Sequence, residues 1–152
     1  MSTTVVSSPP GLLVDTNVIL DVILKRAPWA AEAVLILDAI ARGTARGFVA
    51  GHAITTVHYI VEREAGRTAA NTGVSDLLQV LAVVPLDGTD FQRALALGLR
   101  DYEDAVQVAA CLKAGADYLV TRNGKDYKGG LVTAHTPGEV LGILAAPRGP
   151  TR

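Results

Sequence analysis

Four aspartates in this 152-residue chain stand where an α/β protein places catalytic carboxylates. Asp15 directly follows a short apolar run (LLV), which is typical of a buried strand. Asp126 lies just past a second strand-like run (DYLVT). Asp101 and Asp104 open an apolar helix, and at a spacing of three residues their Cβ atoms lie roughly 5–6 Å apart. Three separate segments therefore supply acidic side chains beside predicted secondary structure.

The chemistry of such a set depends on whether the carboxylates meet. Carboxylates gathered at one place repel each other and raise one another's pKa values. A divalent cation removes that penalty, and a ligand set of oxygen atoms alone selects Mg²⁺ or Mn²⁺ over zinc. Such an ion activates a water molecule and stabilises the charge on a phosphodiester. We therefore expect a cation site formed by Asp15 and Asp104, with Asp101 and Asp126 close by.

Each of these acids also has a simpler structural interpretation. Asp15 can serve as the N-cap of the helix that follows it. Asp101 and Asp104 can be first-turn acids that the helix dipole favours. Asn123, which precedes Asp126, belongs to an Asn-Gly pair, and this dipeptide is typical of a tight turn. Only the joint pattern favours a functional interpretation over these alternatives.

The elements that must position the acids alternate along the chain. Apolar runs bounded by turn residues predict strands at 12–14, 47–50, 83–86, 117–121 and 131–133. Helices are predicted at 18–24, 29–42, 53–65, 76–81 (with a start near 68 left open), 89–97, 101–113 and from 136 onward. Strands separated by helices need crossover connections, so we predict an α/β fold, a three-layer α/β/α sandwich with a mainly parallel sheet of four or five short strands. In such sheets the functional crevice lies at the carboxyl ends of the strands.

The composition fits one domain that needs no disulfide bond or structural zinc site. Hydrophobic residues make up 49% and charged residues 19% of the chain, so a sizeable core is expected. We predict a single domain at 12–146, between a loose lead-in at 1–11 and a tail at 147–152. A net charge of −1 excludes a global basic field for nucleic acid. The lone Cys111, the lack of a signal-peptide pattern and the lack of an apolar span of about 18 residues predict a cytoplasmic protein without a membrane segment.

The three acidic segments resemble the signature blocks of PIN domains. The matching blocks are VDTNVIL at 14–20, DYEDA at 101–105 and AGADYLVTRNGKDY at 114–127, followed by TPGEVL at 136–141. They occur in the family's order and cover nearly the whole domain. The resemblance implies the fold of metal-dependent ribonucleases, a fold common among VapC-type toxins of bacterial toxin–antitoxin pairs.

The resemblance also implies a role for each matching residue. Asp15 is the implied first metal ligand and Asp104 the main acid of the later cluster, with Asp101 and Asp126 as further catalytic acids. The implied supporting residues are Thr16, Asn17, Thr121 and Asn123. The implied cofactor is Mg²⁺ or Mn²⁺. Independently of the resemblance, Arg122 is a candidate for phosphate contact, and a plain surface arginine is the alternative.

Two positions depart from the family pattern. Thr56 stands where family members usually carry an acid on the third helix, and Asn123 stands where many have aspartate. Neither side chain contributes a negative charge, so a lower metal affinity is expected. Two functions therefore stay open. One is a metal-dependent endoribonuclease that cleaves RNA phosphodiester bonds as the toxin of a toxin–antitoxin pair. The other is a catalytically weakened module that binds RNA or protein without cleavage.

The helices near 17–42 and 53–65 carry more apolar side chains than one buried stripe can hold. The run at 34–37 (VLIL) covers more than one helix face. A surplus apolar surface usually marks an interface. The family resemblance points the same way, since its toxin members form dimers and receive an antitoxin segment in a groove beside these helices. We therefore expect a homodimer and an antitoxin-type protein partner, with RNA as the substrate.

Overall fold

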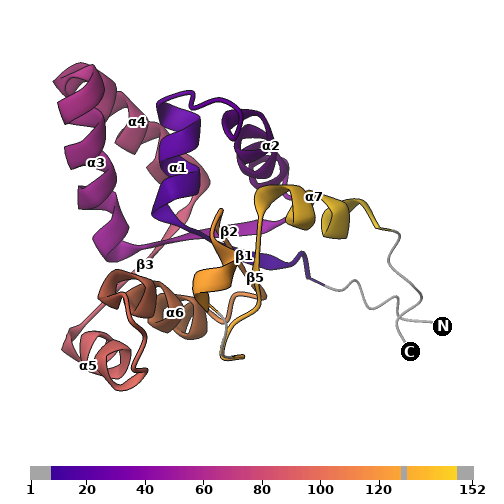
Figure 1. Cartoon of the computed structure of the whole chain (residues 1–152). Coiled ribbons are helices and arrows are strands. Elements are labelled where there is room, and N and C mark those ends of the chain that lie inside the picture. Colours follow the sequence, from indigo (N-terminus) through magenta and orange to yellow (C-terminus); the bar gives the residue numbers. More distant parts are fainter. Residues whose placement is uncertain (1–7, 128–129, 147–152) are drawn as a thin grey trace.

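The protein folds as a five-stranded parallel sheet with helices on both faces (Figure 1). The computed structural model describes residues 8–127 and 130–146, and of Asp126 only the backbone. The strands are β1 (Gly11–Val14), β2 (Arg46–Ala50), β3 (Ala82–Val84), β4 (Tyr118–Val120) and β5 (Ala134–His135). Their order across the sheet is β3-β2-β1-β4-β5, and every pairing is parallel. The predicted α/β/α sandwich is confirmed.

The helices divide into two layers, one on each face of the sheet (Figure 1). One layer holds α1 (Thr16–Ile23), α2 (Ala30–Ala41), α3 (Gly51–Ala65), α4 (Arg67–Val80) and α7 (Pro137–Ala145). The other holds α5 (Gly88–Ala96) and α6 (Tyr102–Ala114). A short 3₁₀ helix, η1 (Gly124–Tyr127), follows β4. None of the helices in the described residues is both long enough and apolar enough to cross a membrane.

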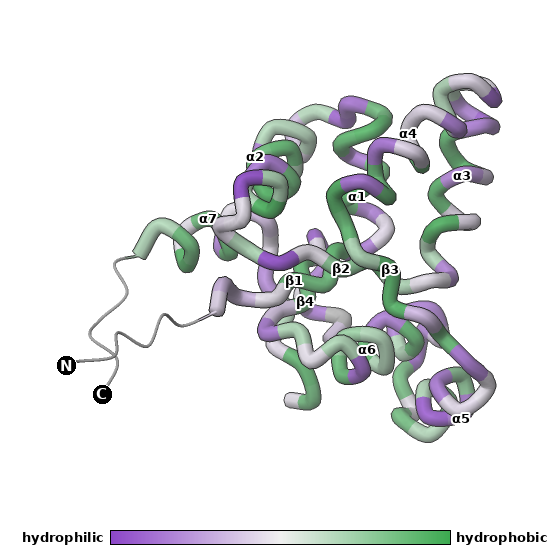
Figure 2. Tube along the Cα trace, turned by 180° about the vertical axis from the view of Figure 1, so that it is seen from behind, coloured by the Kyte–Doolittle hydropathy of each residue, from purple (hydrophilic) through white to green (hydrophobic). Residues whose placement is uncertain are grey.

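The central strands are buried because both faces of the sheet are covered. Leu12, Leu13 and Val14 of β1 are fully buried, and so are Leu119 and Val120 of β4. Figure 2 shows apolar residues in the strands and on the inner sides of the helices. A strand covered on both faces has no solvent side to make polar, which explains the unbroken LLV run.

Polar side chains fix the starts of the helices that matter for the site. Asp15 follows β1 directly and accepts a hydrogen bond from the backbone N–H of Thr16 at 2.7 Å, which starts α1. Asp101 caps α6 by accepting from the backbone N–H of Asp104 at 3.1 Å. The cap expected at Asp15 is thus observed, and Asp101, expected as a first-turn acid, caps α6 instead.

The structure refines the bounds of two predicted elements. The strand expected at 131–133 is wrong by a few residues, since the pairing with β4 involves Ala134 and His135. Helix α4 begins at Arg67, one residue before the start near 68 that the sequence left open, because Gly66 takes a positive φ of 94° that lets the chain turn sharply out of α3. The residues at 67–76 are mostly polar, so their helix is held by packing on α3 rather than marked by apolar periodicity. The predicted tail at 147–152 and residues 1–7 of the lead-in lie outside the described residues, and β1 already begins at Gly11.

Candidate active site

Asp15 is a buried carboxylate at the carboxyl end of the central strand β1. Its Oδ1 accepts hydrogen bonds from the backbone N–H of Thr16 at 2.7 Å and from Nε2 of Gln107 at 3.3 Å. Its Oδ2 accepts from Oγ1 of Thr121 at 2.8 Å and from the hydroxyl of Tyr127 at 3.3 Å. Each carboxylate oxygen therefore has two donors, and these donors fix the plane of the Asp15 side chain.

The hydroxyl of Tyr127 lies between the two acids that the sequence predicts to meet. It is 3.3 Å from Oδ2 of Asp15 and 3.0 Å from Oδ1 of Asp104. The Tyr127 side chain is buried, and burial together with the two neighbouring carboxylates raises its pKa. The phenol consequently stays protonated and donates its single hydrogen to this pair of acids. The structure thus brings Asp15 and Asp104 together through a bridging hydroxyl.

Glu103 adds a third negative charge to this cluster. Burial is the largest cause that raises the pKa of Asp15, the hydrogen bonds that the carboxylate accepts lower it, and the charge of Glu103 raises it further. The pKa of Glu103 is itself raised by partial desolvation and by the carboxylates of Asp101 and Asp104, while a hydrogen bond with the Thr16 side chain lowers it. These shifts mean that the cluster attracts a proton or a cation.

The other predicted site residues take different places. Asp101 is exposed, and its carboxylate caps α6. The side chain of Asn123 is also exposed, whereas its backbone N–H donates to Oγ1 of Thr121 at 3.2 Å. Asn17 has a buried Oδ1 without a hydrogen-bond partner among the described residues. The side chain of Asp126 lies outside them, so its predicted role stays a prediction.

Arg122 turns away from the acids that surround its neighbour Thr121. Its Nε lies 2.8 Å from Oδ2 of Asp21, a carboxylate on α1 whose side chain is 1% exposed. The guanidinium also lies over the indole of Trp29, 4.1 Å from the ring centroid. The structure thus gives Arg122 an ion pair and an aromatic contact, and its phosphate contact stays a prediction.

Sequence reasoning assigned no role to Gln107, Tyr127 or Glu103. Gln107 is fully buried, and it had a signal, because it is the lone polar residue in the apolar helix segment AVQVAACL. Tyr127 and Glu103 lie inside the motif blocks but carried no signal of their own. Their roles depend on which way their side chains point once the helices are packed.

The carboxylates of Asp15 and Asp104 are suitable ligands for a hard cation, but they are only two. Asp15 and Asp104 offer the carboxylate oxygens that Mg²⁺ and Mn²⁺ prefer. In the part of the chain that the structure describes, no group of three or more His, Cys, Asp or Glu side chains is close enough to hold a metal ion. Thr56 donates to the carbonyl of His52 at 3.4 Å within α3 and supplies no charge. A cation bound by Oδ2 of Asp15 and Oδ1 of Asp104 would compete with the Tyr127 hydroxyl for these two oxygens.

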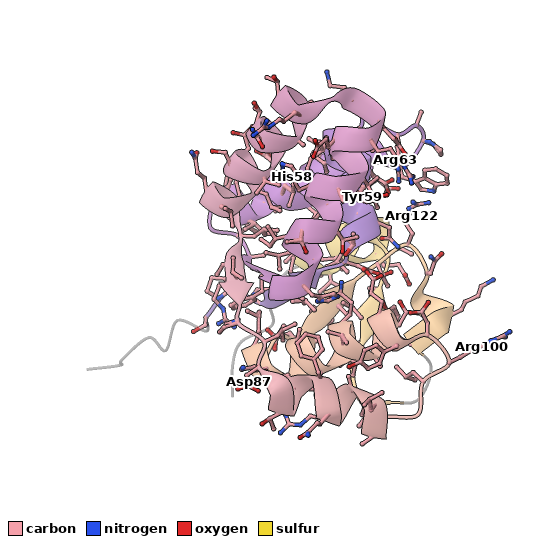
Figure 3. All side chains as sticks on the ribbon, turned by 90° about the vertical axis from the view of Figure 1, so that its left-hand side faces the viewer. His58, Tyr59, Arg63, Asp87, Arg100 and Arg122 are labelled. Carbon is pink, nitrogen blue, oxygen red and sulfur yellow. The ribbon has the colours of Figure 1, made fainter. Side chains whose placement is uncertain are left out.

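A cavity of about 430 Å³ gives solvent access to this edge of the site. It is lined by Leu99, Arg100, Asp101 and Asp104. Arg100 is exposed and extends away from the ribbon (Figure 3). The lining of the cavity therefore combines two carboxylates with one guanidinium.

Most of the chain matches a known protein family, and its fold matches solved structures. The model of the PIN domain family matches residues 11–125. The structure is similar to that of VapBC2 from Rickettsia felis, which was solved bound to a DNA fragment from the VapBC2 promoter. The TM-score is 0.66, with 13% identity over 83% of this chain and 98% of that chain. No match was found among curated protein sequences.

Two further solved structures share this fold. VapC20 from Mycobacterium tuberculosis, a Sarcin-Ricin loop cleaving toxin, gives a TM-score of 0.65 and 17% identity over 80% of this chain and 96% of that chain. A toxin-antitoxin complex from Klebsiella pneumoniae gives a TM-score of 0.63 and 21% identity over 83% of this chain and 97% of that chain. At these identities the likeness shows the fold alone.

Proposed function

The chain belongs to the PIN domain family, and from this premise we propose that it is a metal-dependent endoribonuclease and the toxin of a toxin–antitoxin pair. The observation that carries the proposal is the pairing of Asp15 and Asp104 at the carboxyl edge of a parallel sheet, next to an open cavity. This edge is where sheets of this type bind their ligands. The toxin role is supported by the fold shared with VapC20 and with the toxin-antitoxin complex from Klebsiella pneumoniae.

In this proposal Asp15 and Asp104 hold the cation, and their neighbours orient them. A bound Mg²⁺ or Mn²⁺ ion supplies a polarised water molecule and neutralises charge on the scissile phosphate. Thr121 and Gln107 keep the Asp15 carboxylate in one orientation through their hydrogen bonds. Arg100, which lines the cavity, attracts the phosphate backbone of the RNA.

Substitution of Asp15 by Asn tests the proposal with little disturbance of the fold. Both partners of Oδ2 are hydroxyls, which can accept a hydrogen bond from an amide nitrogen as well as donate one. We expect the wild-type protein to cleave RNA only with Mg²⁺ or Mn²⁺, and Asp15→Asn to lose this activity. Asp38→Asn is the matched control, because Asp38 is an exposed carboxylate that pairs with Arg42 on α2.

Two results contradict the nuclease proposal. One is a wild-type protein that cleaves no RNA at any concentration of either metal. The other is an Asp15→Asn variant that retains full activity while it stays folded by circular dichroism. Full activity of Asp38→Asn is the required result for the control.

The second candidate function is a module that binds RNA or protein without cleavage. It is favoured by Thr56, which bonds within α3 where an acid is expected, and by the lack of a third metal-binding acid in the described residues. Titration calorimetry with Mn²⁺ separates the two functions. Binding in the micromolar range supports the nuclease, whereas no binding at millimolar metal supports the non-catalytic module.

The antitoxin partner is proposed to occupy an apolar groove between α1, α2 and α4. This groove has a volume of about 680 Å³, and its apolar lining includes Ile19, Val22, Ile23, Leu37, Leu77 and Val80. An amphipathic segment of a partner protein can bury its apolar side chains there. Co-expression with the product of a neighbouring small gene tests this, and a complex that forms unchanged when Ile23 is replaced by Glu contradicts the location.

A homodimer is proposed from apolar side chains left on the surface. Val34 and Leu35 on α2 and Leu78 on α4 are each nearly half exposed. Such a surface usually marks an interface. Light scattering is expected to give about twice the chain mass of 15.8 kDa, and a monomer mass at high micromolar concentration contradicts the dimer. The cytoplasmic location expected from the sequence stays a prediction.

A further inference from the structure

A third cavity lies beside the acidic site, on the β4 and β5 side of the sheet. Its volume is about 240 Å³, and we name it the Trp29 pocket after its largest side chain. The pocket is lined by Trp29, Glu32, Arg122, Thr136, Pro137 and Gly138. These residues come from the start of α2, the end of β4 and the start of α7, so three separate segments form one hollow.

The indole of Trp29 contacts Arg122 in this pocket while much of the ring faces solvent. Trp29 is 45% exposed, which is unusual for so large an apolar ring. The guanidinium of Arg122 lies 4.1 Å from the ring centroid, and Arg122 is in turn fixed by its ion pair with the buried Asp21. The guanidinium thus covers one face of the indole, while the exposed part of the ring remains open to a ligand.

The pocket is joined to the acidic site by consecutive residues. Thr121 donates to Oδ2 of Asp15, while the next residue, Arg122, lines the pocket. Asp21, the ion-pair partner of Arg122, follows Asp15 by six residues, which corresponds to roughly 9 Å along the axis of α1. A nucleic acid strand whose phosphate lies at Asp15 can therefore place the base of a neighbouring nucleotide at Trp29.

The charges of the pocket favour a base over a phosphate. Glu32 carries a carboxylate into the lining, and the charge of Arg122 is already balanced by Asp21, so a phosphate group meets no free cation there. A carboxylate only accepts hydrogen bonds, and it therefore selects a ring that carries donors. The amino groups of adenine, cytosine and guanine are such donors, whereas the N–H of uracil lies between two carbonyl oxygens that repel a carboxylate.

We propose that the Trp29 pocket binds one unpaired base of single-stranded RNA, stacked on Trp29 and hydrogen-bonded to Glu32, next to the nucleotide at the acidic site. This inference rests on the proposed function, because it assigns a substrate position to the same site. Stacking of a base on an aromatic side chain tolerates any base, so the preference against uracil comes from Glu32.

The fluorescence of Trp29 provides a direct test, because Trp29 is the only tryptophan in the chain. The full chain is titrated in EDTA with oligo(A), oligo(C) and oligo(U) RNA, and the Asp15→Asn variant is titrated with the same RNAs in Mg²⁺. We expect oligo(A) and oligo(C) to quench the emission at lower concentrations than oligo(U). Glu32→Gln is expected to reduce this difference, since an amide can also donate to a carbonyl oxygen of uracil.

Affinity for labelled RNA is then measured with variants of the pocket. Trp29→Ala is expected to weaken binding by about tenfold, because stacking contributes about 1–3 kcal/mol per base. Trp29→Phe keeps an aromatic face and is expected to recover most of the affinity. The matched control is Tyr59→Ala on α3, since Tyr59 is 64% exposed and has the guanidinium of Arg63 at 5.7 Å from its ring centroid. Figure 3 labels Tyr59 and Arg63 together with Arg122 of the pocket.

The outcomes separate this inference from the nuclease proposal. No quenching by any RNA in either titration overturns the pocket, and so does a folded Trp29→Ala variant with wild-type affinity. Quenching by RNA in a protein that cleaves nothing supports the pocket and contradicts the nuclease. Cleavage with unchanged affinity in Trp29→Ala supports the nuclease and overturns the pocket. An equal loss of affinity in Tyr59→Ala also overturns it, because the effect is then not specific to Trp29.

Discussion

Removal of one hydroxyl group tests whether Tyr127 links the two acids of the site. Tyr127→Phe keeps the buried ring and deletes only the O–H that lies 3.3 Å from Asp15 and 3.0 Å from Asp104. A hydrogen bond to a charged group contributes about 1.5–3 kcal/mol to stability. One hydrogen is shared between two acceptors, and Asp104 is only partly buried, so water replaces the phenol on that side. We therefore expect the metal-free variant to lose about 1.5 kcal/mol of unfolding free energy.

The same substitution is expected to strengthen metal binding. A cation bound by Oδ2 of Asp15 and Oδ1 of Asp104 competes with the Tyr127 hydroxyl for these oxygens, and in the variant this competition no longer exists. If the lost stability of about 1.5 kcal/mol returns on metal binding, the dissociation constant for Mn²⁺ falls by about tenfold. Stability in EDTA and affinity for the metal thus change in opposite directions.

Urea denaturation in EDTA and calorimetric titration with Mn²⁺ measure the two quantities. Tyr102→Phe is the matched control, because the Tyr102 hydroxyl donates to the carbonyl of Phe91 at 3.0 Å and contacts neither acid. We expect this control to leave the Mn²⁺ affinity unchanged. If Tyr127→Phe is as stable as the wild type and binds Mn²⁺ no more tightly, the hydroxyl does not link the two acids.

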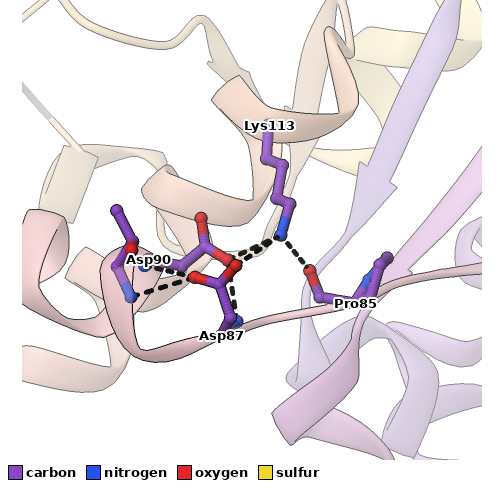
Figure 4. A network of polar contacts seen from close by, with 5 residues as sticks. Pro85, Asp87, Asp90 and Lys113 are labelled. Atoms are coloured by element: carbon purple, nitrogen blue, oxygen red, sulfur yellow. Dashed lines mark hydrogen bonds and ion pairs between the residues drawn. The ribbon is translucent and has the colours of Figure 1, made fainter.

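Three further predictions concern the scaffold. Nζ of Lys113 lies 2.7 Å from Oδ2 of Asp90, and this hydrogen bond lowers the pKa of Asp90 (Figure 4). The contact therefore stabilises the fold fully above the unfolded-state pKa of Asp90. This stabilisation is lost as the pH falls through the folded-state pKa. Lys113→Met should lower the melting temperature at neutral pH and weaken its acid dependence; an unchanged pH profile contradicts this. Gly47→Ala places a Cβ 2.5 Å from Leu81 Cδ2 and should cost about 1–3 kcal/mol in urea denaturation, and a neutral effect contradicts the packing. Thr136→Ala removes the cap of α7 and should cost about 1 kcal/mol, whereas Thr136→Ser should be nearly neutral.

The local signals in the sequence predicted the elements that carry the acids. The unbroken apolar run before Asp15 identified a strand covered on both faces, and the capping chemistry of Asp15 and Asp101 marked the starts of α1 and α6. These signals are reliable because they depend on neighbours within one turn of helix or one strand. The motif blocks then identified the family, and the match over residues 11–125 confirmed it.

Other elements depended on contacts that local patterns do not encode. The first half of α4 is mostly polar, so apolar periodicity marked only its second half, and its packing on α3 completes the helix. The last strand was expected at 131–133, but its position is set by pairing with β4 through Ala134 and His135. Register between strands far apart in sequence is decided by the assembled sheet.

The tertiary structure alone decided the arrangement inside the site. Gln107 and Tyr127 reach Asp15 from positions 92 and 112 residues away along the chain, and both contacts depend on how α6 and the segment after β4 pack beside β1. Arg122, one residue from the site, points instead to Asp21 and Trp29. The sequence determined which residue types stand at the edge of the sheet. The directions of their side chains followed from close packing, because each rotamer must fit neighbours that the fold supplies from distant segments.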